Sequence, residues 1–128
     1  MDGGARGNPG PAAVAAVATA PDGGELAERN AYIGEATNNV AEYRAVLLGL
    51  ELARELGASE VEVVNDSELV ARQLQGRYKV KNAGLKPLFA ETLAALRGFD
   101  RWSVRTVRRE SNERADELVN EALDDARR

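Results

Sequence analysis

The sequence predicts an α/β fold in which a mixed β-sheet carries helices on both faces. An apolar run and a second extended run near the start of the chain flank a turn, and this pattern predicts a β-hairpin. Further along, short apolar runs alternate with stretches of helical periodicity, which is typical of strands joined by crossover helices. Because 128 residues are enough for one compact core and too few for two, we expect a single domain over residues 1–128.

The first third of the chain contains the predicted hairpin. Glycine and proline interrupt residues 3–11, so we predict a loop there. Small and β-branched apolar residues form a run over Ala12–Ala20, and a second extended run covers Glu25–Gly34. The residues Pro21-Asp22-Gly23-Gly24 between these runs predict the turn that joins the two strands.

The rest of the chain predicts alternating helices and strands. From Val40 to Leu56 apolar residues recur at spacings of three and four, the pattern of an amphipathic helix, and Gly57 ends it. The remaining predicted elements are a strand over Val61–Val64, a helix over Ser67–Leu74, a helix beginning near Pro87, a strand over Trp102–Val107 and a closing helix from about Asn112.

The composition excludes several classes of chemistry. The chain has no cysteine and no histidine, which removes disulfides, thiolate or imidazole metal ligands and His-based triads. Any catalysis must therefore rest on carboxylates, hydroxyls, amides or cations. We find neither a signal peptide nor an apolar run long enough to span a bilayer, so we expect a cytoplasmic protein that does not enter a membrane.

The distribution of charge is uneven. The net charge of −4 argues mildly against a nucleic-acid partner, because such proteins need cations that face phosphate. However, the segment from Leu69 to Ala90 contains five basic residues and no acidic one. A second basic cluster follows in residues 97–109, where Asp100 is the one acid. These clusters are either phosphate-binding surfaces or two solvated faces, and the composition leaves both interpretations open.

Four carboxylates stand where predicted elements begin or end, and each has a structural explanation. Asp2 is close to the start of the sequence, and Glu42 lies three residues after Asn39, the spacing of a helix-capping box. Asp66 follows a strand and precedes a helix, so N-capping explains it as well as metal binding does. Asp116 lies near the start of the last helix, where the helix dipole favours an acid. Taken singly, none of the four indicates a function.

The sequence motifs around these four acids say more about function than the acids alone. The chain contains Asp2-Gly-Gly-Ala-Arg-Gly-Asn-Pro-Gly, Thr37-Asn-Asn-Val-Ala-Glu-Tyr, Asn65-Asp-Ser-Glu-Leu-Val and Arg109-Glu-Ser-Asn-Glu-Arg-Ala-Asp. In the identity, order and spacing of these motifs, the sequence resembles the type 1 ribonuclease H family, the RNA–DNA hybrid ribonucleases. The resemblance covers essentially the whole chain.

The resemblance implies both a fold and a reaction. The fold is ribonuclease H-like, with a five-stranded mixed sheet in the order 3-2-1-4-5. The reaction is endonucleolytic hydrolysis of the RNA strand of an RNA–DNA hybrid, leaving 5′-phosphate and 3′-hydroxyl ends. Asp2, Glu42, Asp66 and Asp116 match the residues that hold two Mg²⁺ or Mn²⁺ ions in the family. Two such ions about 4 Å apart stabilise the attacking and leaving oxygens of a displacement at phosphorus, and Mg²⁺ prefers oxygen ligands.

The resemblance also implies which residues bind the hybrid. The glycine loop brings backbone groups and neighbouring side chains close to the 2′-hydroxyls that distinguish RNA from DNA. Thr37 matches a residue that touches a phosphate. Lys79 and Lys81 are expected to contact phosphates in place of the basic handle that some members carry. The full set of expected substrate-binding residues is Gly3, Gly4, Arg6, Asn8, Thr37, Asn38, Asn39, Lys79, Lys81 and Asn112.

The sequence departs from the family pattern in two further respects. The family's first strand normally extends several residues before its aspartate, whereas here Met1 alone precedes Asp2, so we expect a shortened first strand. Several bacterial members carry a histidine on the loop before the last aspartate, and this chain has no histidine. Arg109 or Glu110 is our hypothesis for the residue that assists in its place.

Three other interpretations compete with the hybrid ribonuclease. A binding module of the same fold would have affinity for hybrids but no turnover. A dinucleotide-binding enzyme fits poorly, because its glycine motif follows a strand and opens a helix, whereas this one leads into an extended run. A related nuclease acting on DNA junctions would share the carboxylates without the Thr37-Asn-Asn and Gly7-Asn-Pro-Gly words. For the oligomeric state we expect a monomer.

Overall fold

The computed structural model describes residues 1–127, which form an α/β fold as predicted. The strands are β1 (Asp2–Ala5), β2 (Gly10–Thr19), β3 (Glu25–Ala36), β4 (Glu60–Asn65) and β5 (Arg101–Thr106). The helices are α1 (Asn38–Glu55), α2 (Glu68–Leu74), α3 (Lys86–Leu96) and α4 (Glu113–Ala126), and a short 3₁₀ helix η1 (Arg109–Asn112) precedes α4. The predicted hairpin and all four predicted helices are confirmed, with bounds that shift by a few residues.

The strands form two hydrogen-bonded ladders. β1, β2 and β3 pair in that order, both pairs antiparallel, while β4 and β5 pair in parallel. Over the described residues no ladder joins β1 to β4, although the Met1 amino group donates to the Val64 carbonyl over 3.2 Å. The continuous five-stranded order 3-2-1-4-5 is therefore not confirmed: its two parts are present, and the pairing that would connect them is not. The expected short first strand is confirmed, because β1 has four residues.

The prediction of a loop over residues 3–11 is wrong for its first part. Gly3 and Gly4 lie within β1, where they pair with Val14 and Ala13. A β-carbon at Gly3 would overlap the Ala41 carbonyl of α1. Glycine here reflects a close approach between strand and helix rather than a turn. The true turn is confined to residues 6–9, between β1 and β2.

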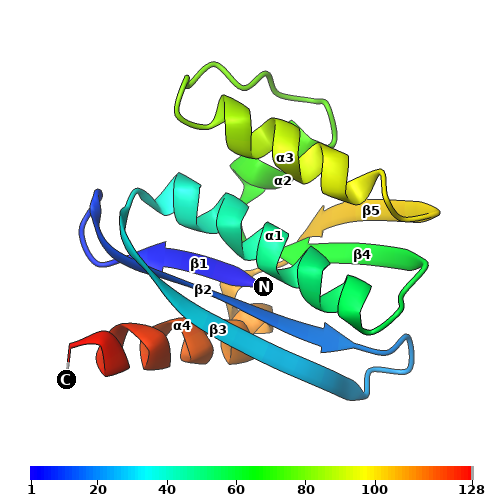
Figure 1. The fold of residues 1–128 in the computed structure, drawn as a ribbon, viewed down its shortest axis with the longest axis horizontal. Helices are drawn as coiled ribbons and strands as arrows, with labels where there is room; N and C mark the ends of the chain where they lie inside the picture. The colour runs from blue at the N-terminus through cyan, green and yellow to red at the C-terminus, as the bar shows by residue number, and fades with distance from the viewer. Residues whose placement is uncertain (128) are drawn as a thin grey trace.

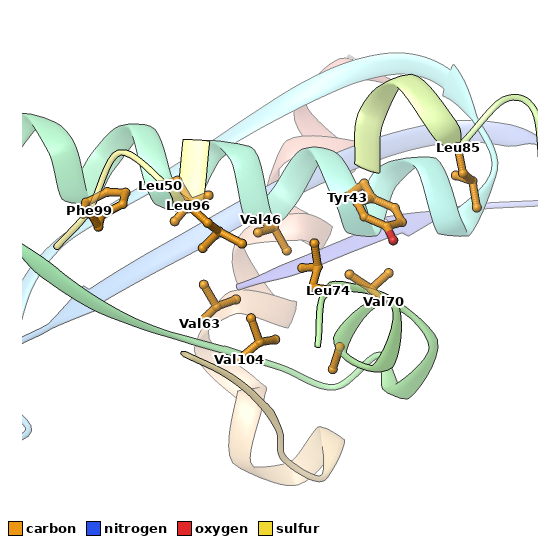
Figure 2. Close-up of a cluster of buried hydrophobic side chains, with 11 residues drawn as sticks. Tyr43, Val46, Leu50, Val63, Val70, Leu74, Leu85, Leu96, Phe99 and Val104 are labelled. Carbon is orange, nitrogen blue, oxygen red and sulfur yellow. The ribbon is translucent and has the colours of Figure 1, made fainter. Parts of the chain in front are cut away.

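Helices cover both faces of the strands, as predicted. Figure 1 shows α1, α2 and α3 on one side and α4 on the other. The first side holds a core of large apolar residues; Figure 2 shows Tyr43, Val46 and Leu50 of α1 in this core beside Val63 of β4 and Leu96 of α3. On the other side, small residues of β2 pack against α4 in a second cluster, which consists of Ala13, Ala15, Ala115, Leu118, Val119, Ala122 and Leu123.

The helix caps differ from those considered in the sequence. Thr37, not Asn39, is the N-cap of α1, and its hydroxyl accepts from the Val40 N–H over 3.3 Å. Ser67, not Asp66, is the N-cap of α2. In both places a hydroxyl satisfies the free N–H groups of the first turn. Neither Glu42 nor Asp66 is needed as a cap, so the structural explanations for these two acids do not hold.

Candidate active site

Acids from four separate elements meet at one edge of the molecule. Asp2 begins β1, Glu42 lies in α1, Asp66 follows β4 and Asp116 lies in the first turn of α4. Ligand oxygens of Asp2, Glu42 and Asp66 all lie within 4.8 Å of one another. The fourth acid, Asp116, lies close enough for its charge to help raise the pKa of Asp2. The sequence separates these residues widely, and the fold brings them together.

The glycine at position 3 explains how Asp2 and Glu42 come together. Because Gly3 has no side chain, β1 lies directly against the Ala41 carbonyl and the Glu42 amide of α1. This close approach places the strand residue Asp2 beside the helix residue Glu42. A bulkier residue would push the strand away from the helix and separate the two acids.

Burial and mutual repulsion raise the pKa of two of these acids. Burial is the larger cause for Glu42, whose pKa rises to about 9, with the charges of Asp2 and Asp66 adding to it. Asp2 is 7% exposed, and its pKa rises to about 7 through burial, then through the charges of Asp66 and Asp116. Near neutral pH and without a cation, part of this cluster therefore holds protons.

This arrangement fits a divalent cation. Buried carboxylates are stable when they are paired with positive charge or coordinate a metal. The nearby cations of the protein are the Met1 amino group and Arg109, whose Nε lies 3.8 Å from Asp66 Oδ2. The Arg109 side chain is 82% exposed, so its charge is weakened by solvent. Oxygen ligands of this kind and density match the preference of Mg²⁺ and similar hard ions.

The acids lie in an open cleft of about 560 Å³. Among the residues predicted to bind substrate, Gly3, Gly4, Arg6, Asn38 and Asn39 line this acid cleft. The Asn38 side-chain oxygen accepts from the Ala5 N–H over 2.9 Å, which ties the start of α1 to the end of β1. Arg6 is held by Asp124, with 2.8 Å between Nη2 and Oδ1.

The other predicted substrate-binding residues do not line the acid cleft. Asn8 supports its rim, because its Oδ1 accepts from the Asn38 N–H over 3.1 Å, and Thr37 is used as a cap. Asn112 is buried and donates to the Met1 carbonyl over 2.7 Å, so the structure gives it a role in packing. Lys79 and Lys81 are exposed in the segment between α2 and α3.

Arg109 and Glu110 were suggested to assist catalysis in place of the loop histidine, and one of the two lies next to the acids. Arg109 lines the acid cleft beside Asp66, whereas Glu110 does not line it. Both belong to η1, immediately before α4. The structure thus brings a guanidinium, and not the Glu110 carboxylate, to the place next to the acids.

Sequence reasoning missed three polar or charged residues that line the acid cleft. Ser67 directly follows Asp66, Arg108 directly precedes Arg109, and Asn120 lies one helical turn after Asp116. The Asn120 side chain donates to the Asp116 carbonyl over 3.1 Å. The spacing of four residues between Asp116 and Asn120 was a usable signal, because side chains at that spacing share one face of a helix.

Comparisons with known proteins agree with this geometry. A family model described as reverse transcriptase-like matches residues 1–122. Ribonuclease HI of Halobacterium salinarum is 49% identical over 126 residues, which cover 98% of this chain and 63% of the relative. A bifunctional protein of Mycobacterium tuberculosis is 48% identical over 126 residues, covering 98% of this chain and 35% of the relative. The chain thus spans less than two thirds of the length of these relatives.

Solved structures show the same likeness over nearly their full length. RNase H1 from Halobacterium salinarum superposes with a TM-score of 0.95 at 48% identity, covering 97% of this chain and 94% of that chain. LC11-RNase H1, isolated from compost by a metagenomic approach and solved in complex with an RNA/DNA hybrid, gives a TM-score of 0.95 at 49% identity, covering 99% of this chain and 96% of that chain. The chain belongs to the ribonuclease H family.

Proposed function

We propose that this chain is a metal-dependent endoribonuclease that hydrolyses the RNA strand of RNA–DNA hybrids, leaving 5′-phosphate and 3′-hydroxyl ends. The observation that carries the proposal is the convergence of Asp2, Glu42 and Asp66, whose ligand oxygens lie within 4.8 Å of one another. Support comes from LC11-RNase H1, a relative at 49% identity that was solved with an RNA/DNA hybrid.

The proposed cofactor is a pair of Mg²⁺ or Mn²⁺ ions. When bound, such ions supply Lewis-acid stabilisation of the attacking and leaving oxygens at phosphorus. Asp2, Glu42, Asp66 and Asp116 would provide the oxygen ligands. Because Asp2 and Glu42 have raised pKa values, they would release protons as the cations bind.

The remaining residues of the acid cleft would position the hybrid. Asn38 and Asn39 present amides at the rim, and the half-buried backbone of Gly4 in the same cleft would face a sugar. Arg108 and Arg109 would face phosphate groups. Arg109 would leave Asp66 when a cation arrives, since a divalent ion carries twice its charge and the Arg109 side chain is largely exposed.

Cleavage of an end-labelled hybrid tests the proposal. The matching duplex RNA, duplex DNA and single strands serve as competing substrates, each with Mg²⁺, with Mn²⁺ and with chelator. We expect metal-dependent cutting of the RNA strand of the hybrid alone, with a phosphate on each new 5′ end. A folded protein that binds the hybrid but never cuts it would instead be a binding module of the same fold.

Three further expectations stay predictions. These are a monomeric state, a cytoplasmic location and a single domain spanning residues 1–128. Among residues 1–127, every helix is too short or too polar to cross a bilayer.

A further inference from the structure

A buried hydrogen bond links the two helices α1 and α2, which both begin beside the acid cleft. The Tyr43 hydroxyl of α1 donates to Gln73 Oε1 of α2 over 2.5 Å. Both side chains are buried, and the two residues are 30 positions apart in the chain. The hydrogen bond is therefore a tertiary contact between separate elements, and it fixes one helix relative to the other.

The Tyr43–Gln73 hydrogen bond lies within the core of large apolar residues. Figure 2 shows the Tyr43 ring beside Leu85, with its hydroxyl oxygen turned toward Val70 of α2. A hydroxyl or an amide in such a place is stable only with a hydrogen-bond partner. Moving α1 relative to α2 would leave both groups unpaired. The bond therefore resists displacement of the helices more than apolar contacts alone would, because apolar attraction has no preferred direction.

Each partner of this hydrogen bond is joined along the chain to one of the acids. Glu42 directly precedes Tyr43 in α1, so a fixed Tyr43 also fixes the backbone from which the Glu42 side chain extends. Asp66 is followed by Ser67, which is the N-cap of the helix that carries Gln73. The relative position of α1 and α2 therefore affects the distance between the Glu42 and Asp66 carboxylates.

The acids themselves favour separation of these elements when no cation is bound. Ligand oxygens of Glu42 and Asp66 lie within 4.8 Å of each other, and like charges at this distance repel. Mg²⁺ and ions of similar size require short, regularly placed oxygen ligands. A contact that holds the two acids together before the ion arrives removes part of the free energy needed to assemble the site.

We propose that Tyr43 and Gln73 are positioning residues, whose hydrogen bond sets the distance between the Glu42 and Asp66 carboxylates for a divalent cation. Neither Tyr43 nor Gln73 lines the acid cleft, so both act through the backbone of their helices. The inference rests on the metal site proposed above and adds the residues that determine its geometry. It gives α2, which supplies none of the four acids, a share in binding the cation.

Mn²⁺ affinity and thermal stability test this proposal in the wild type and three variants. Tyr43→Phe keeps the ring and removes the hydroxyl, which leaves Gln73 Oε1 buried without its donor. A double variant, Tyr43→Phe with Gln73→Met, removes both polar groups at similar volume. Thr92→Val is the matched control, because the buried Thr92 hydroxyl donates to the Leu88 carbonyl within α3 over 2.7 Å, and neither residue lines the acid cleft. Tm is measured in chelator, so that metal binding does not contribute to it.

Tyr43→Phe is expected to lower Tm by about 3 °C or more, because it leaves a buried amide oxygen unpaired. It is also expected to weaken Mn²⁺ binding about fivefold or more. The double variant should regain most of the lost Tm but keep the weakened Mn²⁺ binding. Thr92→Val should lower Tm, and its Mn²⁺ affinity should stay within about twofold of that of the wild type.

Wild-type Mn²⁺ affinity in Tyr43→Phe would overturn the positioning role. Recovery of both Tm and Mn²⁺ affinity in the double variant would also overturn it, since the hydrogen bond would then act through stability alone. An equal loss of affinity in Thr92→Val would lead to the same conclusion. Absence of saturable Mn²⁺ binding by the wild type would overturn the proposed metal site as well, so failure of the metal site is distinguishable from failure of this inference.

Discussion

The boundary between the two ladders has two ends with opposite chemistry. At the acid cleft, carboxylates gather from β1, α1, α4 and the residue after β4. At the other end, a hollow of about 540 Å³ between β2 and β4 is lined mainly by apolar side chains, such as Leu50 and Ala53 of α1. Both ends belong to the same gap between β1 and β2 on one side and β4 on the other. What such a gap can bind therefore depends on which chemical groups line it at each point along the strands.

The physical reason lies in which groups are left without partners. Asp66 directly follows the last residue of β4 and lines the acid cleft, where its carboxylate can bind a cation. Glu60–Val64 lie within β4, where apolar side chains of α1 line the hollow beside them. The acid end is therefore the one that fits a cation.

The largest effect is expected at the acid end. Asp66→Asn removes one charged ligand and should reduce hybrid cleavage by more than about 100-fold, beyond the loss typical of a residue that only supports a metal ligand. The matched control is Glu62→Gln in β4, whose side chain is exposed and paired with Arg105. We expect the control to cleave at the wild-type rate in a gel assay. Equal losses in both variants would place the chemistry elsewhere.

The next largest effect is expected on stability, where substitutions at the neighbouring residues Gly3 and Gly4 should differ. Gly3→Ala should lower the free energy of unfolding by about 2–3 kcal/mol, because its β-carbon would overlap the Ala41 carbonyl. Gly4→Ala is the matched control: its β-carbon would lie 3.7 Å from Val119 Cγ1, an ordinary contact, so a change below about 1 kcal/mol is expected. Urea unfolding measures both. Similar values for the two variants would contradict the close approach of β1 to α1.

These glycines also show where sequence reasoning stopped. Helix α1 and the hairpin of β2 and β3 were predictable, because side-chain periodicity is a local property of the sequence. Gly3 and Gly4 were assigned to a loop, since a glycine needed for close approach looks the same in sequence as one needed for a turn. The approach to Ala41 depends on a helix far along the chain and cannot be inferred locally.

The candidate site was predictable in part for a similar reason. The motifs around Asp2, Glu42 and Asp66 predicted a cluster, and the structure brings these acids together. The caps at Thr37 and Ser67 were missed because several residues near each helix start can cap it. Asn112 was expected at the substrate and lies buried against Met1, a contact between residues far apart in the sequence.

Stability measured against pH should show that the buried carboxylates of Asp2 and Glu42 destabilise the metal-free protein when they are ionised. Asp2 and Glu42 have pKa values raised to about 7 and about 9, so the folded state binds more protons than the unfolded state between about pH 4 and pH 9. The free energy of unfolding of the metal-free protein should therefore fall as pH rises through that range. The lowered pKa of the Met1 amino group acts in the opposite direction, but it is one group against two.

Added Mg²⁺ should flatten this pH dependence, because the cation replaces the bound protons and binds more tightly at higher pH. Urea unfolding at several pH values, with Mg²⁺ and with chelator, measures the difference. A free energy of unfolding that rises with pH in chelator would contradict the raised pKa values of Asp2 and Glu42. Asp66→Asn should reduce the slope, because Asp66 contributes to the shift of both acids.

The smallest expected effect lies outside both ends of the boundary. Lys79→Ala with Lys81→Ala should weaken hybrid binding and reduce the dependence of log K on log salt by about 2, because each lysine that binds a phosphate accounts for about 1. Arg29→Ala, in β3 and outside both basic clusters, serves as the control, because this arginine is already paired with Glu55. Binding measured by fluorescence anisotropy at several salt concentrations tests this. A slope unchanged from the wild type would remove these lysines from the interface.

The central claim is that the acid end of the boundary holds divalent cations, and Mn²⁺ binding to the protein alone measures this most directly. Electron paramagnetic resonance of free Mn²⁺ during titration gives the bound fraction. We expect saturable binding by the wild type and by Glu62→Gln, and a loss of about tenfold or more in affinity for Asp66→Asn. Wild-type binding of Mn²⁺ no tighter than that of Asp66→Asn would show that the cluster is not a metal site.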